Sequence, residues 1–439
     1  MNRRGFLSVL GLSTFASVAM QAEEDGRPKI TSPRATSGDS AIEPNWDERV
    51  TISVGNKEGD FAGSTEKVLQ AAVDSVARLG GGTVKVLPGT YRLRNSVYLA
   101  SKVRLVGSGA DSVLIKEPSV KTKLVADSDW YDQEITLEES SGFRVGDGVV
   151  IRCKNPHNGG PTVLKRTLVA RKGNRFKLDK ALRDNVWQGG DPTVASLFPL
   201  ISGELISDCV IENITLDGNR EKNDHFDGNH SGCIFLQDCN RIAMRGVEAR
   251  NNNGDGISWQ ISHDVVVEKC HSHDNADLGL HPGSGSQRPV IRGNRIERCN
   301  IGIFFCWGVK YGLAEKNTIE GIRTASISIG HRDTDNIVRE NVIKNSGIAG
   351  VLFRPERGPS FAGHRNRIER NEITNSGGDD GVGIDIQGGT ESIELIENRI
   401  IEQRGPAKRI GIRLGALTKQ IQLTNNHVEG FSQEVADLR

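Results

Sequence analysis

Residues 231–355 repeat one short phrase of apolar residues, and this repetition decides the fold. The phrase reads Ser-Gly-Cys-Ile-Phe-Leu at 231–236, Asp-Gly-Ile-Ser-Trp-Gln at 255–260, Leu-Gly-Leu-His-Pro at 278–282, Ile-Gly-Ile-Phe-Phe-Cys-Trp at 301–307, Ser-Ile-Ser-Ile-Gly-His at 326–331 and Ala-Gly-Val-Leu-Phe-Arg-Pro at 349–355. Two further copies stand at 382–386 and 410–414. Apolar residues alternate within each copy, and each copy is too short for a helix, so each predicts a β-strand.

A second phrase, Asn-x-Ile or Asn-x-Val, runs in step with these strands. It begins at Asn294, Asn317, Asn341, Asn371, Asn398 and Asn426, so successive copies are 23 to 30 residues apart. A repeat of this length, made of strands and turns, indicates a solenoid whose coils pair as parallel strands. Coils stack about 4.8 Å apart, so equivalent residues form columns. We predict an all-β, right-handed parallel β-helix with an internal Asn column and an inward column of Ile257, Leu280, Ile303, Ile327, Val351, Ile384 and Ile412.

The first folded residues predict a cap on this solenoid. Residues 64–79 have the spacing of one amphipathic helix, with Ser64 as its N-cap and glycines at 80–82 as its stop. Gly-Gly-Thr-Val-Lys-Val-Leu-Pro-Gly-Thr-Tyr follows at 81–91, and Val-Arg-Leu-Val-Gly stands at 103–107. This succession resembles the N-terminal cap and first coils of the pectate-lyase-like β-helix superfamily, over residues 46–118 and 200–430. The resemblance implies a carbohydrate-active protein, and the helix is expected to close the open end of the solenoid.

The remaining segments complete the predicted organisation. Residues 119–200 break the period with short strands and polar turns, which predicts a small antiparallel β insertion. Arg3-Arg4 and the apolar run after them resemble a twin-arginine export signal, so the expected location is periplasmic or secreted. The predicted segments are a signal peptide (1–22), a disordered leader (23–45), the cap and first coils (46–118), the insertion (119–200), the repeats with the substrate face (201–432) and a C-terminal tail (433–439).

Charge and hydropathy limit the classes of partner. The chain has 56 Lys and Arg against 56 Asp and Glu, a formal net charge of zero, so nothing global favours nucleic acid. The N-terminal apolar run is too short for a permanent anchor, and no other segment reaches the length of a membrane span. The oligomeric state does not follow from the sequence.

Polar and ionisable side chains interrupt the outward positions of several coils. The residue after each inward apolar residue points outward on a strand. We expect one flank, over four or five coils, to gather Ser258, His281, Trp307, Lys310, Tyr311, His331, Arg332, Arg354 and Glu356. Aromatic rings stack on sugars, and charged groups bind substituents or transfer protons. The predicted partner is therefore a polysaccharide.

Two reactions compete for this flank. A lyase or C5-epimerase removes the proton next to a uronate carboxylate, which requires a base and a cation that neutralises the carboxylate. Two histidines and four cations supply that set, which favours a lyase on an acidic glycan: His281, His331, Lys310, Arg332, Arg354 and Arg357. A glycoside hydrolase needs two carboxylates instead. Asp255 and Asp277, on adjacent coils, weakly resemble the aspartates of polygalacturonase-type β-helix hydrolases, whose paired Asp-Asp motif is missing here.

A non-catalytic glycan-binding or surface solenoid is the third interpretation, and the ionisable variety of residues 281–357 argues against it. The predicted catalytic residues are His281, His331, Lys310, Arg354, Asp255 and Asp277, and the predicted substrate-binding residues are Ser258, Trp307, Tyr311, Arg332, Glu356 and Arg357.

No metal site and no definite cofactor are predicted. His271 and His273 alternate as ligands on a strand do, but they lie on the side of the Asn column. Calcium stays an open alternative, although the motif that surrounds the calcium site of pectate lyases is missing.

Overall fold

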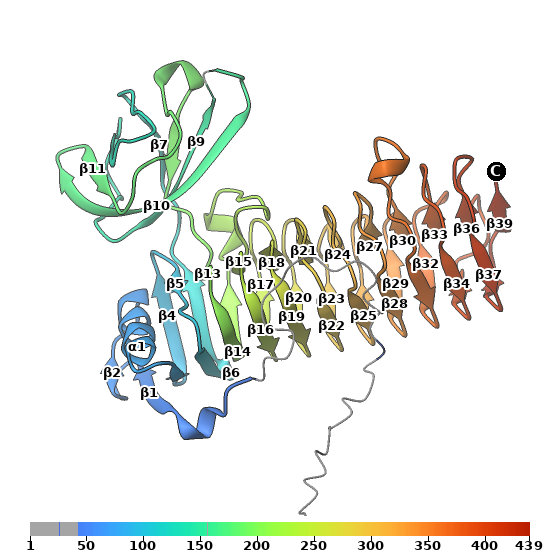
Figure 1. The fold of residues 1–439 in the computed structure, drawn as a ribbon, viewed down its shortest axis with the longest axis horizontal. Coiled ribbons are helices and arrows are strands. Elements are labelled where there is room, and N and C mark those ends of the chain that lie inside the picture. Colours follow the sequence, from blue (N-terminus) through green and yellow to red (C-terminus); the bar gives the residue numbers. More distant parts are fainter. Residues whose placement is uncertain (1–25, 27–42, 156) are drawn as a thin grey trace, which may run out of the picture.

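The computed structural model describes residue 26 and residues 43–155 and 157–439. The predicted signal peptide, and the predicted leader except for residues 26 and 43–45, lie outside the described residues. The chain winds into a right-handed parallel β-helix whose coils follow one another in sequence order (Figure 1). No helix among the described residues is long and apolar enough to cross a membrane.

One wall of the β-helix is an 11-stranded parallel sheet. Its strands are β5 (Val97–Tyr98), β13 (Ile201–Glu204), β15 (Ile234–Gln237), β18 (Ile257–Gln260), β21 (Leu278–Gly283), β24 (Ile301–Phe304), β27 (Ala325–Ile329), β30 (Ala349–Phe353), β33 (Val382–Ile386), β36 (Ile410–Leu414) and β39 (Gln433–Asp437). The predicted tail, 433–439, is corrected here, because β39 pairs with β36 and extends the sheet by one strand.

The other walls form a 22-stranded parallel sheet. Its strands are β1 (Val50–Gly55), β2 (Phe61–Ala62), β3 (Gly82–Val86), β4 (Gly89–Leu93), β6 (Val103–Lys116), β14 (Ser207–Asp217), β16 (Asn240–Arg245), β17 (Glu248–Arg250), β19 (His263–Glu268), β20 (His271–His273), β22 (Val290–Arg292), β23 (Arg295–Glu297), β25 (Leu313–Glu315), β26 (Thr318–Glu320), β28 (Ile337–Arg339), β29 (Val342–Ser346), β31 (Arg367–Glu369), β32 (Glu372–Ser376), β34 (Glu394–Ile396), β35 (Arg399–Ile401), β37 (Gln422–Thr424) and β38 (His427–Glu429). Short 3-10 helices are η1 (Trp46–Glu48), η2 (Gln188–Gly190), η3 (Arg220–Lys222) and η4 (Pro359–Phe361).

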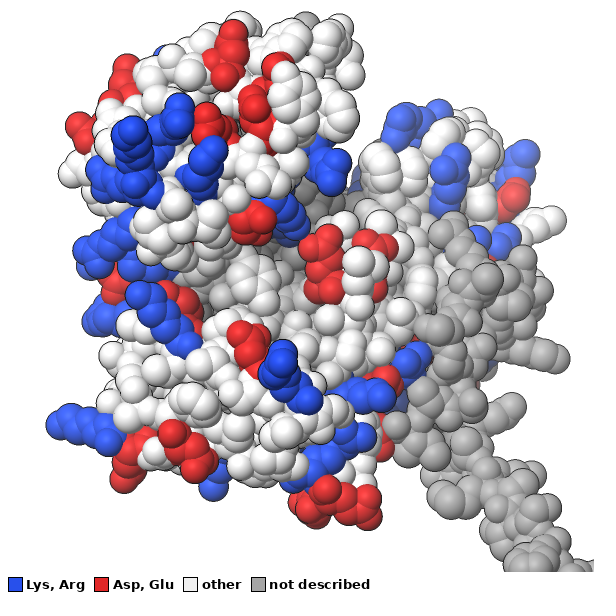
Figure 2. All heavy atoms as spheres, turned by 60° about the vertical axis from the view of Figure 1, so that its left-hand side comes forward, with Lys and Arg blue, Asp and Glu red and all other residues white. Residues whose placement is uncertain are grey.

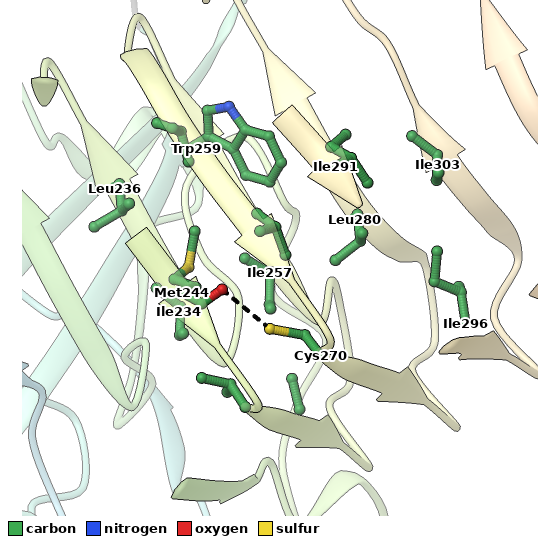
Figure 3. Packing of buried hydrophobic residues seen from close by; sticks show 14 of the residues in the cluster. Ile234, Leu236, Met244, Ile257, Trp259, Cys270, Leu280, Ile291, Ile296 and Ile303 are labelled. Atoms are coloured by element: carbon green, nitrogen blue, oxygen red, sulfur yellow. Dashed lines mark hydrogen bonds between the residues drawn. The ribbon is translucent and has the colours of Figure 1, made fainter. Parts of the chain in front are cut away.

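The predicted inward column is confirmed. Ile257 pairs with Leu280, Leu280 with Ile303, and the register continues in this way to Ile412. All seven residues are at most 1% exposed. Figure 3 shows Ile257, Leu280 and Ile303 packed inside the coils with Trp259 beside them. Because each residue packs on its equivalents in the coils above and below, one apolar residue per coil maintains a continuous core.

The internal Asn column is also present. Asn317 Nδ2 donates to Asn341 Oδ1 (2.9 Å) and to the carbonyl of Ile291 (3.0 Å). The same amide ladder runs from Asn294 to Asn426. Buried amides need hydrogen-bond partners, and each Asn finds them in the coils before and after its own. The ladder therefore fixes the spacing of the turns.

Helix α1 (Glu66–Arg78) closes the N-terminal end. Leu69, Val73 and Val76 are fully buried against the first coils. The N-cap is Thr65 rather than the predicted Ser64.

The predicted insertion is a separate antiparallel sheet of six strands with its own core. It comprises β7 (Lys121–Lys123), β8 (Glu134–Thr136), β9 (Gly148–Lys154), β10 (Pro161–Lys172), β11 (Arg175–Leu178) and β12 (Thr193–Ala195). It projects from the first coils on the side where β5, β13 and β15 lie (Figure 1).

Candidate functional site

A pocket of about 750 Å³ lies between the insertion and the outer face of the 11-stranded sheet. The sheet contributes Ser202, Phe235, Gln237 and Gln260, the segment after β24 contributes Cys306 and Trp307, and the insertion contributes Val163 and Lys165 among others. The surface in Figure 2 is hollowed between the insertion and the coils. A concave surface with aromatic walls and a few polar groups is the usual form of a ligand site.

Lys165, on β10, brings a cation into this pocket. Its Nζ lies 3.7 Å from the centre of the Phe235 ring and donates a hydrogen bond to the carbonyl of His230 (3.0 Å). Burial lowers the pKa of Lys165 to about 8, because a desolvated ammonium is less stable than a solvated one. Lys165 is therefore a cation near neutral pH that loses its charge a little above it.

Beside the pocket, His281 and Asp255 form a buried pair on adjacent coils. His281 Nδ1 lies 2.7 Å from Asp255 Oδ2, and Asp255 Oδ1 accepts a hydrogen bond from the backbone of Leu278 (3.1 Å). Burial raises the pKa of Asp255, and the hydrogen bond from His281 opposes this rise. A carboxylate at Nδ1 fixes the tautomer that leaves Nε2 as the proton acceptor. His281 Nε2 is buried and has no hydrogen-bond partner in the described part of the chain.

The loop between β14 and β15, residues 218–233, covers this pair, and we call it the covering loop. Ser258 Oγ donates to the carbonyl of Gly228 (2.6 Å) and lies 3.4 Å from His281 Nδ1. A Cβ on Gly228 would stand 1.7 Å from Asp255 Oδ2, so only glycine allows this approach. Ser258 and His281 do pair on the outward face of the sheet. Both are nevertheless buried under the covering loop, with His281 2% and Ser258 0% exposed.

Arg354 and Phe304 continue the outward face from His281. The Phe304 ring centre lies 5.4 Å from the centre of the His281 ring and 4.5 Å from the Arg354 guanidinium. Arg354 also donates to Ser328 Oγ (2.8 Å) and to Glu356 Oε1 (3.2 Å). His281 and Arg354 thus both contact one aromatic ring, that of Phe304.

Asp333 supports the turn that carries Trp307. Its Oδ1 accepts hydrogen bonds from the backbone of Gly308 and of Val309, both 2.9 Å long. Burial raises the pKa of Asp333 to about 7, although Arg354 and the backbone donors oppose this rise. Asp333 lies out of solvent contact, so its role is to position the turn.

Trp307 and its neighbours form a surface that we call the aromatic platform: Trp307, His331, Arg332, Arg357 and Phe361. Trp307 is 55% exposed and stacks on His331 with ring centres 4.4 Å apart and an angle of 17°. The Arg332 guanidinium lies 4.2 Å from the Phe361 ring, and that of Arg357 lies 5.1 Å from it. His331 Nδ1 is 3.4 Å from Glu356 Oε2. Trp307 also lines the pocket, so platform and pocket form one continuous site.

Three predicted residues line neither the pocket nor the aromatic platform. Asp277 pairs with His225 at 2.6 Å rather than with a second carboxylate. Lys310 lies beyond the turn, where its charge lowers the pKa of Asp335. Tyr311 is 1% exposed and offers no ring surface to a ligand.

Sequence reasoning missed Lys165, His230 and Phe361. Nothing in the repeat indicates where the insertion lies, so Lys165 could not be placed from the sequence. The sequence did offer a signal for Phe361. The longest interval between copies of the Asn phrase, from Asn341 to Asn371, indicates a long loop, and it contains Phe361 together with Arg354 and Arg357.

Comparisons with known proteins agree with the fold. Residues 233–400 match the family described as the right handed beta helix region. A search of curated proteins found no match. Among solved structures, the A-module of a mannuronan C-5 epimerase from Azotobacter vinelandii is similar with a TM-score of 0.54 and 14% identity, over 84% of this chain and 92% of that chain.

Two other solved structures are similar at 11% identity. One is described as a glycoside hydrolase, with a TM-score of 0.51 over 87% of this chain and 97% of that chain. The other is the surface protein and adhesin PfbA from Streptococcus pneumoniae, with a TM-score of 0.50 over 85% of this chain and 96% of that chain. Likeness at this level of identity establishes the fold, so the chemistry has to be argued from the site.

Proposed function

We propose that this right-handed parallel β-helix protein is an enzyme that removes the proton next to the carboxylate of a uronate residue in an acidic polysaccharide, as a lyase. The observation that carries this proposal is the Asp255–His281 pair, in which Asp255 binds Nδ1 and leaves Nε2 without a partner. A neutral imidazole in this tautomer is suited to accept a proton near neutral pH.

In the proposed reaction, His281 Nε2 takes the proton from C5 of the uronate. The C5–H electrons form a C4=C5 double bond while the bond from C4 to the glycosidic oxygen breaks. The leaving oxygen takes up one proton, for which His331 is the proposed donor, because Glu356 holds its Nδ1. If the same carbanion regains a proton on its other face instead, the product is an epimer and the chain stays intact.

The cations of the site support an acidic substrate. Lys165 lies in the pocket over Phe235, and Arg332 and Arg357 border the exposed ring of Trp307 through Phe361. A sugar stacked on Trp307 would place its carboxylate within the field of these guanidinium groups. Neutralising that carboxylate stabilises the negative charge that develops when the C5 proton leaves.

Access to His281 requires the covering loop to shift. Gly228 and His230 belong to this loop, and their carbonyls bind Ser258 and Lys165. A substrate that displaces these two hydrogen bonds would open a path from the pocket to Nε2. Loops that complete a site on binding are common in enzymes that must exclude water.

The hydrolase alternative receives less support from the geometry. Both oxygens of Asp255 are used, by His281 and by the backbone of Leu278, and Asp277 pairs with His225. Neither carboxylate is arranged to protonate a leaving group or activate a water for the other.

Incubation with a panel of neutral and acidic polysaccharides tests the proposal. We expect products with unsaturated ends that absorb in the ultraviolet, from uronate-containing substrates only. Reducing ends without that absorbance would establish a hydrolase, and binding without any product would establish a non-catalytic binder. An inverted C5 centre in an uncleaved chain would establish the epimerase.

We also propose that the protein is exported, as its N-terminal residues suggest.

A further inference from the structure

The outer face of the 22-stranded sheet carries a second group of ionisable side chains, on the wall away from the proposed substrate site. Glu248 on β17 pairs in register with His271 on β20, and His273 follows two residues later on the same face. One ligand atom from each of the three lies within 4.8 Å of the other two. The two imidazole rings are stacked, with centres 4.0 Å apart.

His273 makes the hydrogen bonds that a metal-binding histidine usually makes: a carboxylate holds one ring nitrogen, and the other nitrogen faces the candidate site. Its Nδ1 lies 2.6 Å from Asp274 Oδ2, and Arg298 holds the same carboxylate with two bonds of 2.7 and 2.8 Å. Its Nε2 lies 3.1 Å from Glu248 Oε1. A carboxylate on one imidazole nitrogen orients the ring and makes the other nitrogen a better ligand.

A fourth donor comes from the next coil. His271 Nε2 lies 2.8 Å from Glu297 Oε2 on β23, and Glu297 is largely buried. Two imidazole nitrogens and the Glu248 carboxylate therefore lie close together, and Glu297 on the next coil contacts one of those nitrogens. This set matches zinc and similar divalent ions, whereas calcium and magnesium prefer oxygen ligands alone.

We propose that Glu248, His271, His273 and Glu297 bind one divalent transition-metal ion of the zinc class. Binding displaces the Nε2 protons, and small side-chain rotations bring the donor atoms to the usual distances of about 2.0–2.2 Å. Three guanidinium groups compete for the same carboxylates, since Arg250 binds Glu248, Arg295 binds Glu297, and Arg298 also lies near Glu297. This competition predicts a micromolar site rather than a picomolar one.

The ion would join the coils that carry the proposed base. Strand β20 leads directly into β21, which contains His281, and β17 leads into β18 by way of Asp255. An ion bound only by the folded protein stabilises it in proportion to its saturation. We therefore assign it the role of a clip that holds these coils in register.

Zinc titration of the protein after treatment with a chelator tests this site. We expect one zinc ion per chain by calorimetry, a rise in the thermal midpoint at saturation, and a visible absorption band when Co²⁺ replaces Zn²⁺. His271→Ala and His273→Ala should each weaken binding at least about 100-fold and remove the rise. Glu248→Gln preserves shape, and we expect it to weaken binding at least about tenfold. Asp274→Asn should weaken zinc binding about 10- to 100-fold, because Asp274 is not a ligand and acts only by orienting His273.

His427→Ala is the matched control. His427 belongs to the same sheet on β38 and lies 3.3 Å from Glu429, but it has no second histidine beside it on its strand. This variant should bind zinc as the natural sequence does. The proposal is overturned if the unaltered protein takes up no stoichiometric zinc, or if the His271 and His273 variants, with an intact strand signal in circular dichroism, bind as tightly as the His427 control.

Discussion

Asp255 Oδ2 lies 2.7 Å from His281 Nδ1, and the two residues are 26 positions apart on adjacent coils. The parallel register of β18 and β21 fixes this contact, because Ser258 pairs with His281 and Asp255 stands just before Ile257. The proposed base and its orienting carboxylate are thus placed by two adjacent strands of the parallel sheet. The spacing of the coils, rather than a flexible loop, sets their geometry.

Removal of the imidazole should abolish most of the turnover. We expect His281→Gln to lower kcat by about 10²- to 10⁴-fold, the usual loss for a proton-transfer group. Asp255→Asn should also lower kcat, because the amide no longer favours the Nδ1–H tautomer. Initial rates on a uronate polysaccharide measure both effects.

Both residues are buried, so the thermal midpoint of each variant has to be measured alongside the rates. Asp277→Asn is the comparison variant, because Asp277 pairs with His225 rather than with His281. If Asp255→Asn and Asp277→Asn abolish turnover while His281→Gln retains it, the two carboxylates are the catalytic groups and the enzyme is a hydrolase.

The charge of Lys165 predicts a pH dependence of substrate affinity. Burial lowers its pKa to about 8, so the cation present at pH 7 is lost as the pH rises through that value. We expect KM for an acidic glycan to rise between pH 7 and pH 9.5. Lys165→Arg keeps its charge over this range and should flatten the profile, whereas Lys165→Met should give a high KM throughout. A natural protein and Lys165→Arg with the same pH profile of KM would exclude Lys165 from carboxylate binding.

Arg357 provides a test of the aromatic platform. Its side chain is exposed and lies 5.9 Å from the Trp307 ring. We expect Arg357→Ala to weaken binding of an acidic glycan more at low than at high ionic strength, because salt screens the lost attraction. Trp307→Ala should weaken binding equally at both. Calorimetric titrations at two salt concentrations separate these effects, and equal losses for Arg357→Ala at both would remove the electrostatic role.

Most of the fold could be predicted from the sequence because the coils repeat. Ile257 and Leu280 share a column for the same reason that Asn317 and Asn341 do, since equal spacing along the chain becomes stacking in space. The ends were harder to place. Residues 433–437 lack the apolar run of the earlier copies and are mostly exposed, yet they pair with β36 through their backbone.

The candidate site could be predicted only in part. Trp307 and His331 follow the ends of successive strands, so their neighbourhood on one flank follows from the period. The burial of His281 does not follow from the period, because it depends on how residues 218–233 fold over the sheet. Tyr311 stands in the turn after β24 with a φ of 57°, and its ring is buried. A strand pattern gives no direction for a side chain in such a turn.

The proposed export depends on Arg3 and Arg4. Replacing both with Lys should trap the precursor in the cytoplasm, because twin-arginine signals require the pair. Fractionation of cells followed by immunoblotting measures the distribution. A variant with one arginine replaced serves as the intermediate case. Normal export of the double variant would exclude the twin-arginine pathway.

Lys116 gives a stability test that is independent of the proposed activity. It is 2% exposed at the end of β6, and its Nζ lies 3.3 Å from Asn252 Oδ1. Burial lowers its pKa to about 8, whereas the unfolded chain has a Lys pKa of about 10.4. Below pH 8 both states bind the proton, and the folded state bears the full penalty of a buried charge. Between pH 8 and 10.4 the unfolded state binds more protons than the folded state, so stability rises with pH.

Lys116→Met removes this dependence. The free energy of unfolding of the natural protein, relative to that of Lys116→Met, should therefore rise by about 3 kcal/mol between pH 7 and pH 10.5, from about 1.4 kcal/mol per pKa unit. Other titrating groups cancel in this difference, and so does the loss of the bond to Asn252, which does not depend on pH. Urea unfolding of both proteins at several pH values measures it. Parallel stability curves over this range would mean that Lys116 keeps its proton in the folded state, and that water reaches it inside the coil.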